Sequence, residues 1–255
     1  MSSPSASTTR RADVLELRYE AAVAWMHLAD TENGNRLTPA LVGALHTAID
    51  ELATRDDVRV VVLAAHGDDF CRGHAVPTTP APRAECLATC DLMLRLASLP
   101  CITVAAAHGM VADAGIELVA SCDLALGAAS ARFLACDPTR DHWPHTTQVA
   151  LSRALAPRQA FELLLDRQAR DAATVARSGL LHAVVPDAQL DDAVAALAAR
   201  LAAWPPETLA RGKQAFARQL AMNRADAYDY ALDQLLSDLR REEAGTLAEA
   251  GPREP

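Results

Sequence analysis

The sequence predicts an α/β fold, and three observations carry that prediction. Residues 58–66 and 101–109 are continuous apolar runs, which are typical of strands buried on both faces of a parallel sheet. Segments with helical spacing lie before, between and after these runs, so strands and helices alternate along the first half of the chain. Just over half of the 255 residues are hydrophobic, which is enough to bury the core of one large domain.

The N-terminal half is predicted to begin with a hairpin. Residues 14–20 alternate in polarity and residues 22–29 follow after a short turn, a pattern that indicates two antiparallel strands. Residues 38–55 have helical spacing, with Thr38 as the N-cap and Pro39 at the first helical position. The next expected elements are the strand 58–66, a loop rich in Gly and Pro, a helix over about 85–98, the strand 101–109, a helix at 113–121 and a strand at 123–129.

The second half is predicted to be almost wholly helical. Helical patterns cover residues 147–166, 171–180, 187–204, 205–222 and 225–243, and the apolar segment 180–186 is the one expected strand. The predicted organisation is a flexible tail at 1–12, a core at 13–200, a helical C-terminal region at 201–243 and a second flexible tail at 244–255.

Composition and charge exclude several classes of protein. The net charge of −9 argues against nucleic acid or an anionic membrane as a partner. No apolar run reaches membrane-spanning length and the N-terminus has no apolar signal segment, so a cytoplasmic location is expected. The six cysteines form no C-x-x-C pair, and neither H-E-x-x-H nor a G-x-G-x-x-G after a strand occurs. We therefore expect no metal, nicotinamide or flavin cofactor.

One acid in an apolar segment marks a candidate site. Glu117 stands between Ile116 and Leu118 in the segment HGMVADAGIELVASCD. Burying an unpaired carboxylate costs on the order of several kcal/mol, or keeps the group protonated. A chain that keeps such a residue often uses it at a working site.

Together with its surroundings, this segment resembles the crotonase, or enoyl-CoA hydratase/isomerase, superfamily. The resemblance runs from about residue 14 to 222 and rests on the order of several motifs. These are GNRLTPALV at 34–42, VVVLAAHGDDFCRGHAV at 60–76, the segment 101–137, RQAFELLLDRQARDAATVARSGLLHAVVP at 158–186 and LARGK at 209–213. The resemblance implies a spiral of ββα turns, a helical C-terminal region used for trimer packing, and acyl-thioester substrates.

The resemblance also implies a set of catalytic groups. The family stabilises a thioester enolate with two backbone N–H groups, which fall here on His74, after Gly73, and on Ala114. Such a donor can be worth about 3–4 kcal/mol. The family's two carboxylates fall on Glu117 and Asp137, which could divide water activation and proton delivery between them.

Departures from the family pattern leave alternatives open. Asp113 stands where glycine is usual, either as a substrate contact or as a simple helix N-cap. Asp137 is one methylene shorter than the usual glutamate and precedes Pro138, so a capping role competes with catalysis. The polar segment 141–145 replaces an apolar wall, and there His145 is either a third catalytic residue or part of a surface loop.

The default reaction is hydration of an enoyl thioester or the reverse dehydration. A specialised crotonase that uses His145, as a decarboxylase, C–C hydrolase or cyclase, is the alternative, and a noncatalytic subunit with this fold is a third. The expected substrate is an acyl-CoA or acyl-carrier thioester, coenzyme A enters only as part of it, and the expected assembly is a homotrimer or a dimer of trimers. His66 and His108 flank turns and are interpreted as structural. The residues expected to bind substrate are Arg36, Leu37, Cys71, Gly73, Asp113 and Trp143.

Overall fold

The computed structural model describes residues 8–75, 82–136 and 143–249. The chain divides into two compact units, residues 1–206 and residues 207–255. The first unit contains every predicted site residue. The second contains the last two helices, α8 (Pro206–Gln219, which begins at the boundary) and α9 (Arg224–Glu249).

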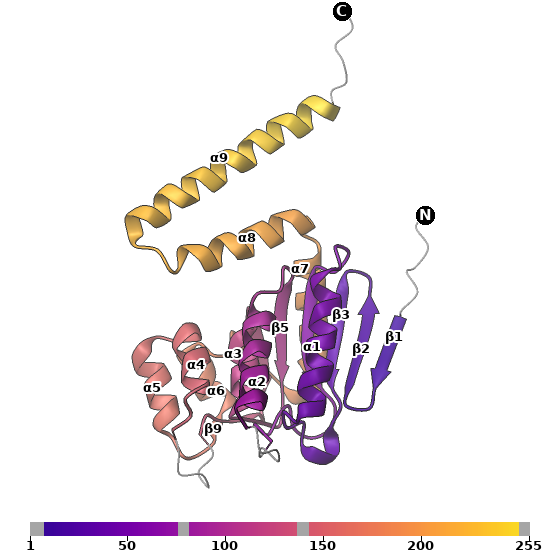
Figure 1. The fold of residues 1–255 in the computed structure, drawn as a ribbon, viewed down its shortest axis with the longest axis vertical. Coiled ribbons are helices and arrows are strands. Elements are labelled where there is room, and N and C mark those ends of the chain that lie inside the picture. The colour runs from indigo at the N-terminus through magenta and orange to yellow at the C-terminus, as the bar shows by residue number, and fades with distance from the viewer. Residues whose placement is uncertain (1–7, 76–81, 137–142, 250–255) are drawn as a thin grey trace, which may run out of the picture. The chain divides into compact units, whose positions relative to one another are not determined.

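A seven-stranded sheet forms the centre of the first unit (Figure 1), in the order β1-β2-β3-β4-β5-β7-β10. The first three strands are antiparallel, and the strands from β3 to β10 run parallel. The strands are β1 (Thr8–Ala12), β2 (Leu15–Glu20), β3 (Val23–Leu28), β4 (Val60–Ala65), β5 (Ile102–Ala107), β7 (Leu124–Ala128) and β10 (Ala183–Val185). The predicted hairpin and the predicted parallel strands are therefore confirmed.

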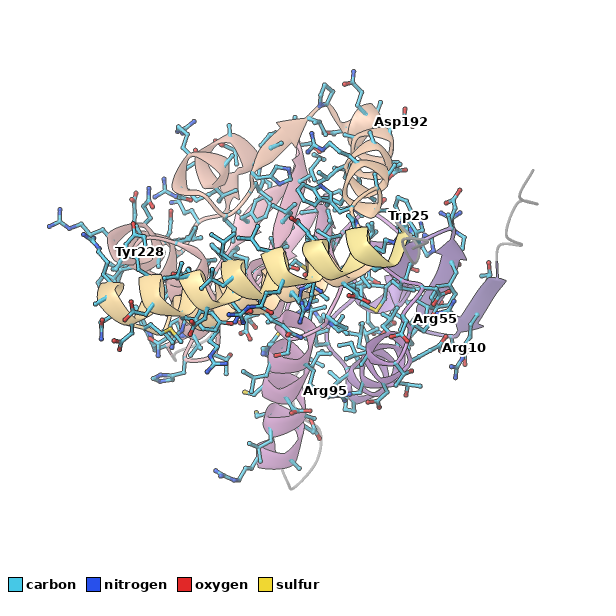
Figure 2. The ribbon with its side chains drawn as sticks, turned by 90° about the horizontal axis from the view of Figure 1, so that it is seen from above. Arg10, Trp25, Arg55, Arg95, Asp192 and Tyr228 are labelled. Carbon is cyan, nitrogen blue, oxygen red and sulfur yellow. The ribbon has the colours of Figure 1, made fainter. Side chains whose placement is uncertain are left out.

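Helices cover both faces of this sheet. α1 contacts β2 and α2, whereas α7 contacts β3, β4, β5 and β7. Seen from above in Figure 2, α2 with Arg95 lies on one side of the sheet and α7 with Asp192 lies on the other. The helices of this unit are α1 (Pro39–Ala53), α2 (Pro82–Ala97), α3 (Ala114–Ser121), α4 (Thr147–Ala154), α5 (Pro157–Leu165), α6 (Ala172–Ser178) and α7 (Leu190–Ala202), with short 3-10 helices at Thr31–Asn33 and Asp187–Gln189. Thr38 caps α1 as predicted, because its hydroxyl accepts the Leu41 N–H at 3.2 Å.

A second, three-stranded sheet was not predicted. It consists of β6 (Met110–Ala112), β8 (Arg132–Leu134) and β9 (Arg170–Asp171). Strands of two or three residues are too short to display an alternating pattern, so sequence periodicity could not reveal them. Isolated bridges from Leu37 to His74 and from Cys71 to Val111 tie the loop after β4 to its neighbours.

Two boundaries differ from the prediction. Residues 8–12 form β1 and pair with β2 along its whole length, so this part of the predicted tail is a strand. Ladder hydrogen bonds hold this strand against β2, and polar residues can make them without any apolar pattern. At the other end α9 continues to Glu249, past the predicted start of the second tail at residue 244.

The second unit exposes many large apolar side chains, most of them on its two helices. These are Phe216, Leu220, Tyr228, Leu232, Leu235, Leu236 and Leu239. No helix in the described part of the chain combines the length and apolar character that crossing a membrane requires. Contiguous exposed apolar side chains often mark contact surfaces between proteins.

We therefore expect the chain to assemble with copies of itself, and the family resemblance predicts a trimer or a pair of trimers. Multi-angle light scattering should report at least three chains per particle. Replacing Leu232 and Leu236 of α9 with glutamate should lower that mass. A dilute wild-type monomer with full activity would contradict this prediction.

Candidate active site

The candidate site is built where the loop after β4 meets the start of α3. The Cys71 N–H donates to the Met110 carbonyl at 3.2 Å, and the Ala112 N–H donates back to the Cys71 carbonyl at 2.9 Å. Farther along the loop, the Leu37 N–H donates to the Gly73 carbonyl at 2.9 Å. These backbone hydrogen bonds fix the loop against β6 on one side and the residues before α1 on the other.

Two glycines let the loop and α3 approach this closely. Gly73 has φ +103°, and a Cβ there would lie 2.9 Å from the Asp113 Cβ. A Cβ on Gly115 would lie 2.5 Å from the Cys71 carbonyl oxygen. Any larger residue at either position would push the helix N-terminus away from the turn.

The two predicted oxyanion donors lie in this junction, but they differ in what they contact. Ala114 is the first residue of α3, so its N–H has no partner inside the helix. The His74 N–H, by contrast, donates to Asp113 Oδ2 at 3.3 Å. A carboxylate of the chain itself thus accepts the hydrogen bond that the resemblance assigns to the substrate.

Asp113 does not cap α3 in the simple way that was proposed from the sequence. It stands at the N-cap position, but its side chain makes no capping hydrogen bond. Its φ of +48° is unusual for a residue other than glycine. The carboxylate faces His74 instead, and its Oδ1 lies 3.4 Å from the Thr147 hydroxyl.

Glu117 is buried as predicted, with 2 % of its surface exposed. Its Oε1 accepts hydrogen bonds from the hydroxyls of Thr146 at 2.7 Å and Thr147 at 2.8 Å. Burial raises the pKa of this carboxyl above its ordinary value, and the nearby Asp113 charge adds to the effect. The threonine hydrogen bonds and His74 act in the opposite direction, since they stabilise the anion.

The His74 side chain lies between the two acids. Its Nδ1 is 3.6 Å from Asp113 Oδ2, and its Nε2 is 3.8 Å from Glu117 Oε1. Nδ1 is buried without a hydrogen-bond partner among the described residues. The three side chains also hold ligand-type atoms within 4.8 Å of one another. However, the imidazole turns a different nitrogen toward each carboxylate, which suits proton exchange better than three ligands converging on one ion.

Three contributions to this site were not predicted from the sequence. One is the His74 side chain, which was expected to contribute only its backbone N–H, although a histidine directly after the turn glycine was a visible signal. The other two are Thr146 and Thr147, which directly follow His145 at the start of a predicted helix. Adjacent hydroxyl side chains at a helix start are usually caps, so nothing local pointed to Glu117.

A pocket of about 450 Å³ opens beside these groups. Glu117 is not among its lining residues, but its partners His74 and Thr146 are. Five predicted site residues line the pocket, namely Leu37, His74, Asp113, Trp143 and His145. The rest of the wall comes mainly from α1 and α2, including Val42, His46, Cys86, Ala88 and Cys90.

The remaining predicted residues lie behind the pocket or outside the described chain. The Arg36 guanidinium donates to the Arg72 carbonyl at 2.7 Å and so holds the turn. Cys71 is fully buried, and burial raises the pKa of its thiol to about 12, so it stays protonated at neutral pH. Asp137, together with residues 141 and 142 of the polar segment, lies outside the described residues.

Comparison with known proteins places this geometry in a family. The enoyl-CoA hydratase/isomerase family model matches residues 18–248. Enoyl-CoA hydratase domain-containing protein 3, mitochondrial, from Homo sapiens is 29 % identical over 237 residues, which cover 89 % of this chain and 78 % of that protein. (E)-benzylidenesuccinyl-CoA hydratase from Thauera aromatica is 28 % identical over 243 residues, which cover 91 % and 94 %.

Solved structures agree with this placement. The crystal structure of an enoyl-CoA hydratase from Mycobacterium smegmatis superposes with a TM-score of 0.82 at 30 % identity, and the match covers 97 % of this chain and 98 % of that one. The predicted crotonase-type α/β fold is therefore confirmed. Because the family model matches residues 18–248, which is most of this chain, the chain belongs to the enoyl-CoA hydratase/isomerase family of the crotonase superfamily.

Proposed function

We propose that this chain is an enzyme that hydrates an enoyl thioester, or catalyses the reverse dehydration, through a thioester enolate. One observation carries the proposal. Glu117 is a buried carboxyl with a raised pKa, and its partners His74 and Thr146 line a pocket beside two candidate oxyanion donors. A carboxyl whose pKa lies nearer neutrality than that of an ordinary glutamate is suited to taking and returning a proton.

Water adds to the substrate through an enolate in the proposed reaction. Glu117 takes a proton from water as the oxygen adds to the β-carbon of the enoyl thioester. The charge moves to the thioester oxygen, where the N–H groups of His74 and Ala114 would stabilise the enolate. A proton then returns to the α-carbon and completes the addition of one water. For the His74 N–H to serve, the Asp113 carboxylate must first leave it, because the two are hydrogen-bonded.

A coenzyme A thioester is the proposed substrate, and coenzyme A enters only as part of it. Two relatives support this choice by name, the benzylidenesuccinyl-CoA hydratase of Thauera aromatica and the human enoyl-CoA hydratase domain-containing protein. A specialised crotonase acting on a carrier-bound thioester is the second candidate. It is favoured by His145, an exposed titratable side chain on the pocket wall where the family usually has apolar residues.

The test is a panel of acyl-CoA and acyl-carrier thioesters incubated with the purified chain. Hydration is expected to remove the ultraviolet absorbance of the conjugated enoyl thioester and to add the mass of one water. Release of carbon dioxide, or a cleaved acyl chain, would instead support the function of a specialised crotonase. A chain that turns over no thioester in the panel would point to a noncatalytic subunit.

Variants of Asp137 and His145 distinguish a hydratase from a specialised crotonase. In a hydratase, Asp137→Asn should lower kcat by about 10²-fold or more, because it removes the second proton carrier, whereas His145→Ala should change kcat little. Both are measured on one thioester across about pH 5–9, a window that brackets histidine titration. The reverse order of effects would favour the specialised crotonase, and equal small effects would favour isomerase- or decarboxylase-type chemistry.

A further inference from the structure

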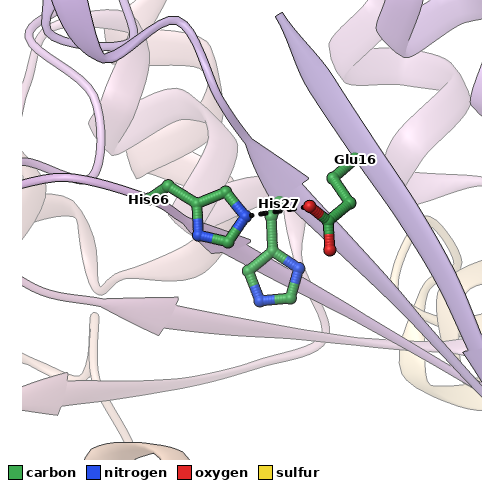
Figure 3. A group of neighbouring side chains, drawn as sticks. All are labelled: Glu16, His27 and His66. Atoms are coloured by element: carbon green, nitrogen blue, oxygen red, sulfur yellow. Dashed lines mark ion pairs between the residues drawn. The ribbon is translucent and has the colours of Figure 1, made fainter. Parts of the chain in front are cut away.

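We propose that Glu16, His27 and His66 form a binding site for a divalent transition-metal ion, with zinc as the expected occupant. It lies apart from the acyl pocket, which is the cavity lined by His74, Asp113 and Thr146 and proposed to hold the thioester substrate. From the sequence, His66 was expected to be a structural residue beside a turn, and no role was predicted for Glu16 or His27. Figure 3 shows the three side chains next to one another, with a dashed line joining the His66 ring to the Glu16 carboxylate and the His27 ring beside them.

Strand register brings these three side chains to one face of the sheet. Glu16 of β2 and His27 of β3 are direct cross-strand partners, and such partners point to the same face. His27 is in register with Ala64 of β4. His66 lies two residues farther on, and its N–H continues the ladder by donating to the Leu28 carbonyl at 2.8 Å. With a side-chain period of two, His66 falls on the face that Ala64 shares with His27.

The distance between the His66 and Glu16 ligand atoms suits a single small ion. His66 Nε2 lies 3.4 Å from Glu16 Oε2. Two ligands of one tetrahedral zinc ion, each about 2.0–2.1 Å from the metal, are themselves about 3.4 Å apart. All three ligand-type atoms lie within 4.8 Å of one another. The His27 and His66 rings are stacked with centroids 4.7 Å apart and an angle of 7° between their planes. Because a metal ion lies in the plane of each imidazole that binds it, the His27 ring must turn out of this stack to share an ion with His66.

The His27 side chain has a free nitrogen that could serve as a metal ligand. Its Nδ1 is buried and has no hydrogen-bond partner among the described residues, a state that costs free energy unless something fills it.

The surroundings give an ion both access and charge. A cavity of about 530 Å³ is lined by His27 and His66, and also by Asp68, His108 and Asp191. That space can admit an ion with water in its remaining coordination positions. Two imidazoles with one carboxylate favour zinc, iron, cobalt or nickel, whereas magnesium and calcium prefer all-oxygen sites.

This site is separate from the catalytic groups. Its cavity shares no lining residue with the acyl pocket. Asp191 of α7 lines the cavity of the metal site, whereas residues of α1 and α2 line the acyl pocket. Figure 2 shows α7 and α2 on opposite sides of the sheet. Hydration activity is therefore expected to survive chelation even though the metal is lost, so failure of this inference would leave the proposed function standing.

The experiment uses the full chain after treatment with a chelator and dialysis. Zinc binding is measured by isothermal titration, and the melting temperature is followed with and without zinc. Wild type should bind one zinc ion at this site and melt at a higher temperature with it. Glu16→Gln, which keeps the shape of the side chain, and His27→Phe, which keeps the stacked ring, should each weaken this binding by more than about tenfold.

Two matched controls keep the result specific. His182→Gln removes an exposed histidine elsewhere, and Glu117→Gln removes an acid of the other histidine–carboxylate cluster; neither should change the affinity. Cobalt added as a spectroscopic probe should show nitrogen and oxygen ligation without a thiolate charge-transfer band. Unchanged zinc binding in Glu16→Gln and His27→Phe, a thiolate band, or no binding at micromolar zinc would each overturn the proposal.

Discussion

Replacing Glu117 with glutamine is expected to lower turnover by about 10²–10⁴-fold, because glutamine keeps the shape of the side chain but cannot take a proton. The fold should persist, since the amide oxygen can still accept the hydroxyls of Thr146 and Thr147. Steady-state kinetics on an enoyl thioester and thermal unfolding measure the two effects. Normal turnover would remove Glu117 from the mechanism, and loss of the folded state would mean that its role is structural.

Glu117→Gln should also change how the stability of the chain depends on pH. Burial raises the pKa of Glu117 in the folded chain, so the folded state holds this proton to higher pH than the unfolded state does. The contribution of Glu117 to the free energy of unfolding is fully present below the ordinary glutamate pKa of about 4.3 and is lost as the pH rises through the folded value. Glu117→Gln removes that loss. Its melting temperature relative to wild type should therefore rise with pH and then level off.

Replacing Asp113 with glycine is expected to raise kcat/KM for an enoyl thioester by about 10–100-fold. The Asp113 carboxylate accepts the His74 N–H at 3.3 Å, and a hydrogen bond to a charged group is worth about 1.5–3 kcal/mol. Removing the carboxylate frees the donor and removes a negative charge from the place where the enolate charge is proposed to develop. Glycine also tolerates the φ of +48° that aspartate adopts there.

A control and a pH profile make this prediction specific. Asp113→Asn keeps an oxygen that can accept the His74 N–H but removes the charge, so its gain should be smaller. Because the Asp113 charge helps to raise the pKa of Glu117, Asp113→Gly should move the acidic limb of the kcat/KM profile to lower pH. A fall in kcat/KM with glycine would instead identify Asp113 as a catalytic acid. It would contradict the proposal that the Asp113 carboxylate lowers activity by occupying the His74 N–H.

Much of the fold could be predicted because its elements carry strong local patterns. The run at 60–65 is apolar throughout, so it could only be a strand or helix buried on all sides. Thr38 and Pro39 marked the start of α1 within its own sequence. The burial of Glu117 followed from its neighbours on α3, since the residues around it had no polar face to offer. The short strands β6, β8 and β9 had no such pattern and were missed.

The sequence by itself thus determined the α/β class, the order of the long elements and the place of one buried acid, because each depends on residues close together in the chain. Tertiary structure decided which groups surround that acid. His74 meets Asp113 across 39 positions, and Thr147 meets Glu117 across 30. Glu16, His27 and His66 likewise converge only through strand register. Such contacts depend on how strands and helices pack, and the local periodicity of a sequence cannot predict how distant segments pack together.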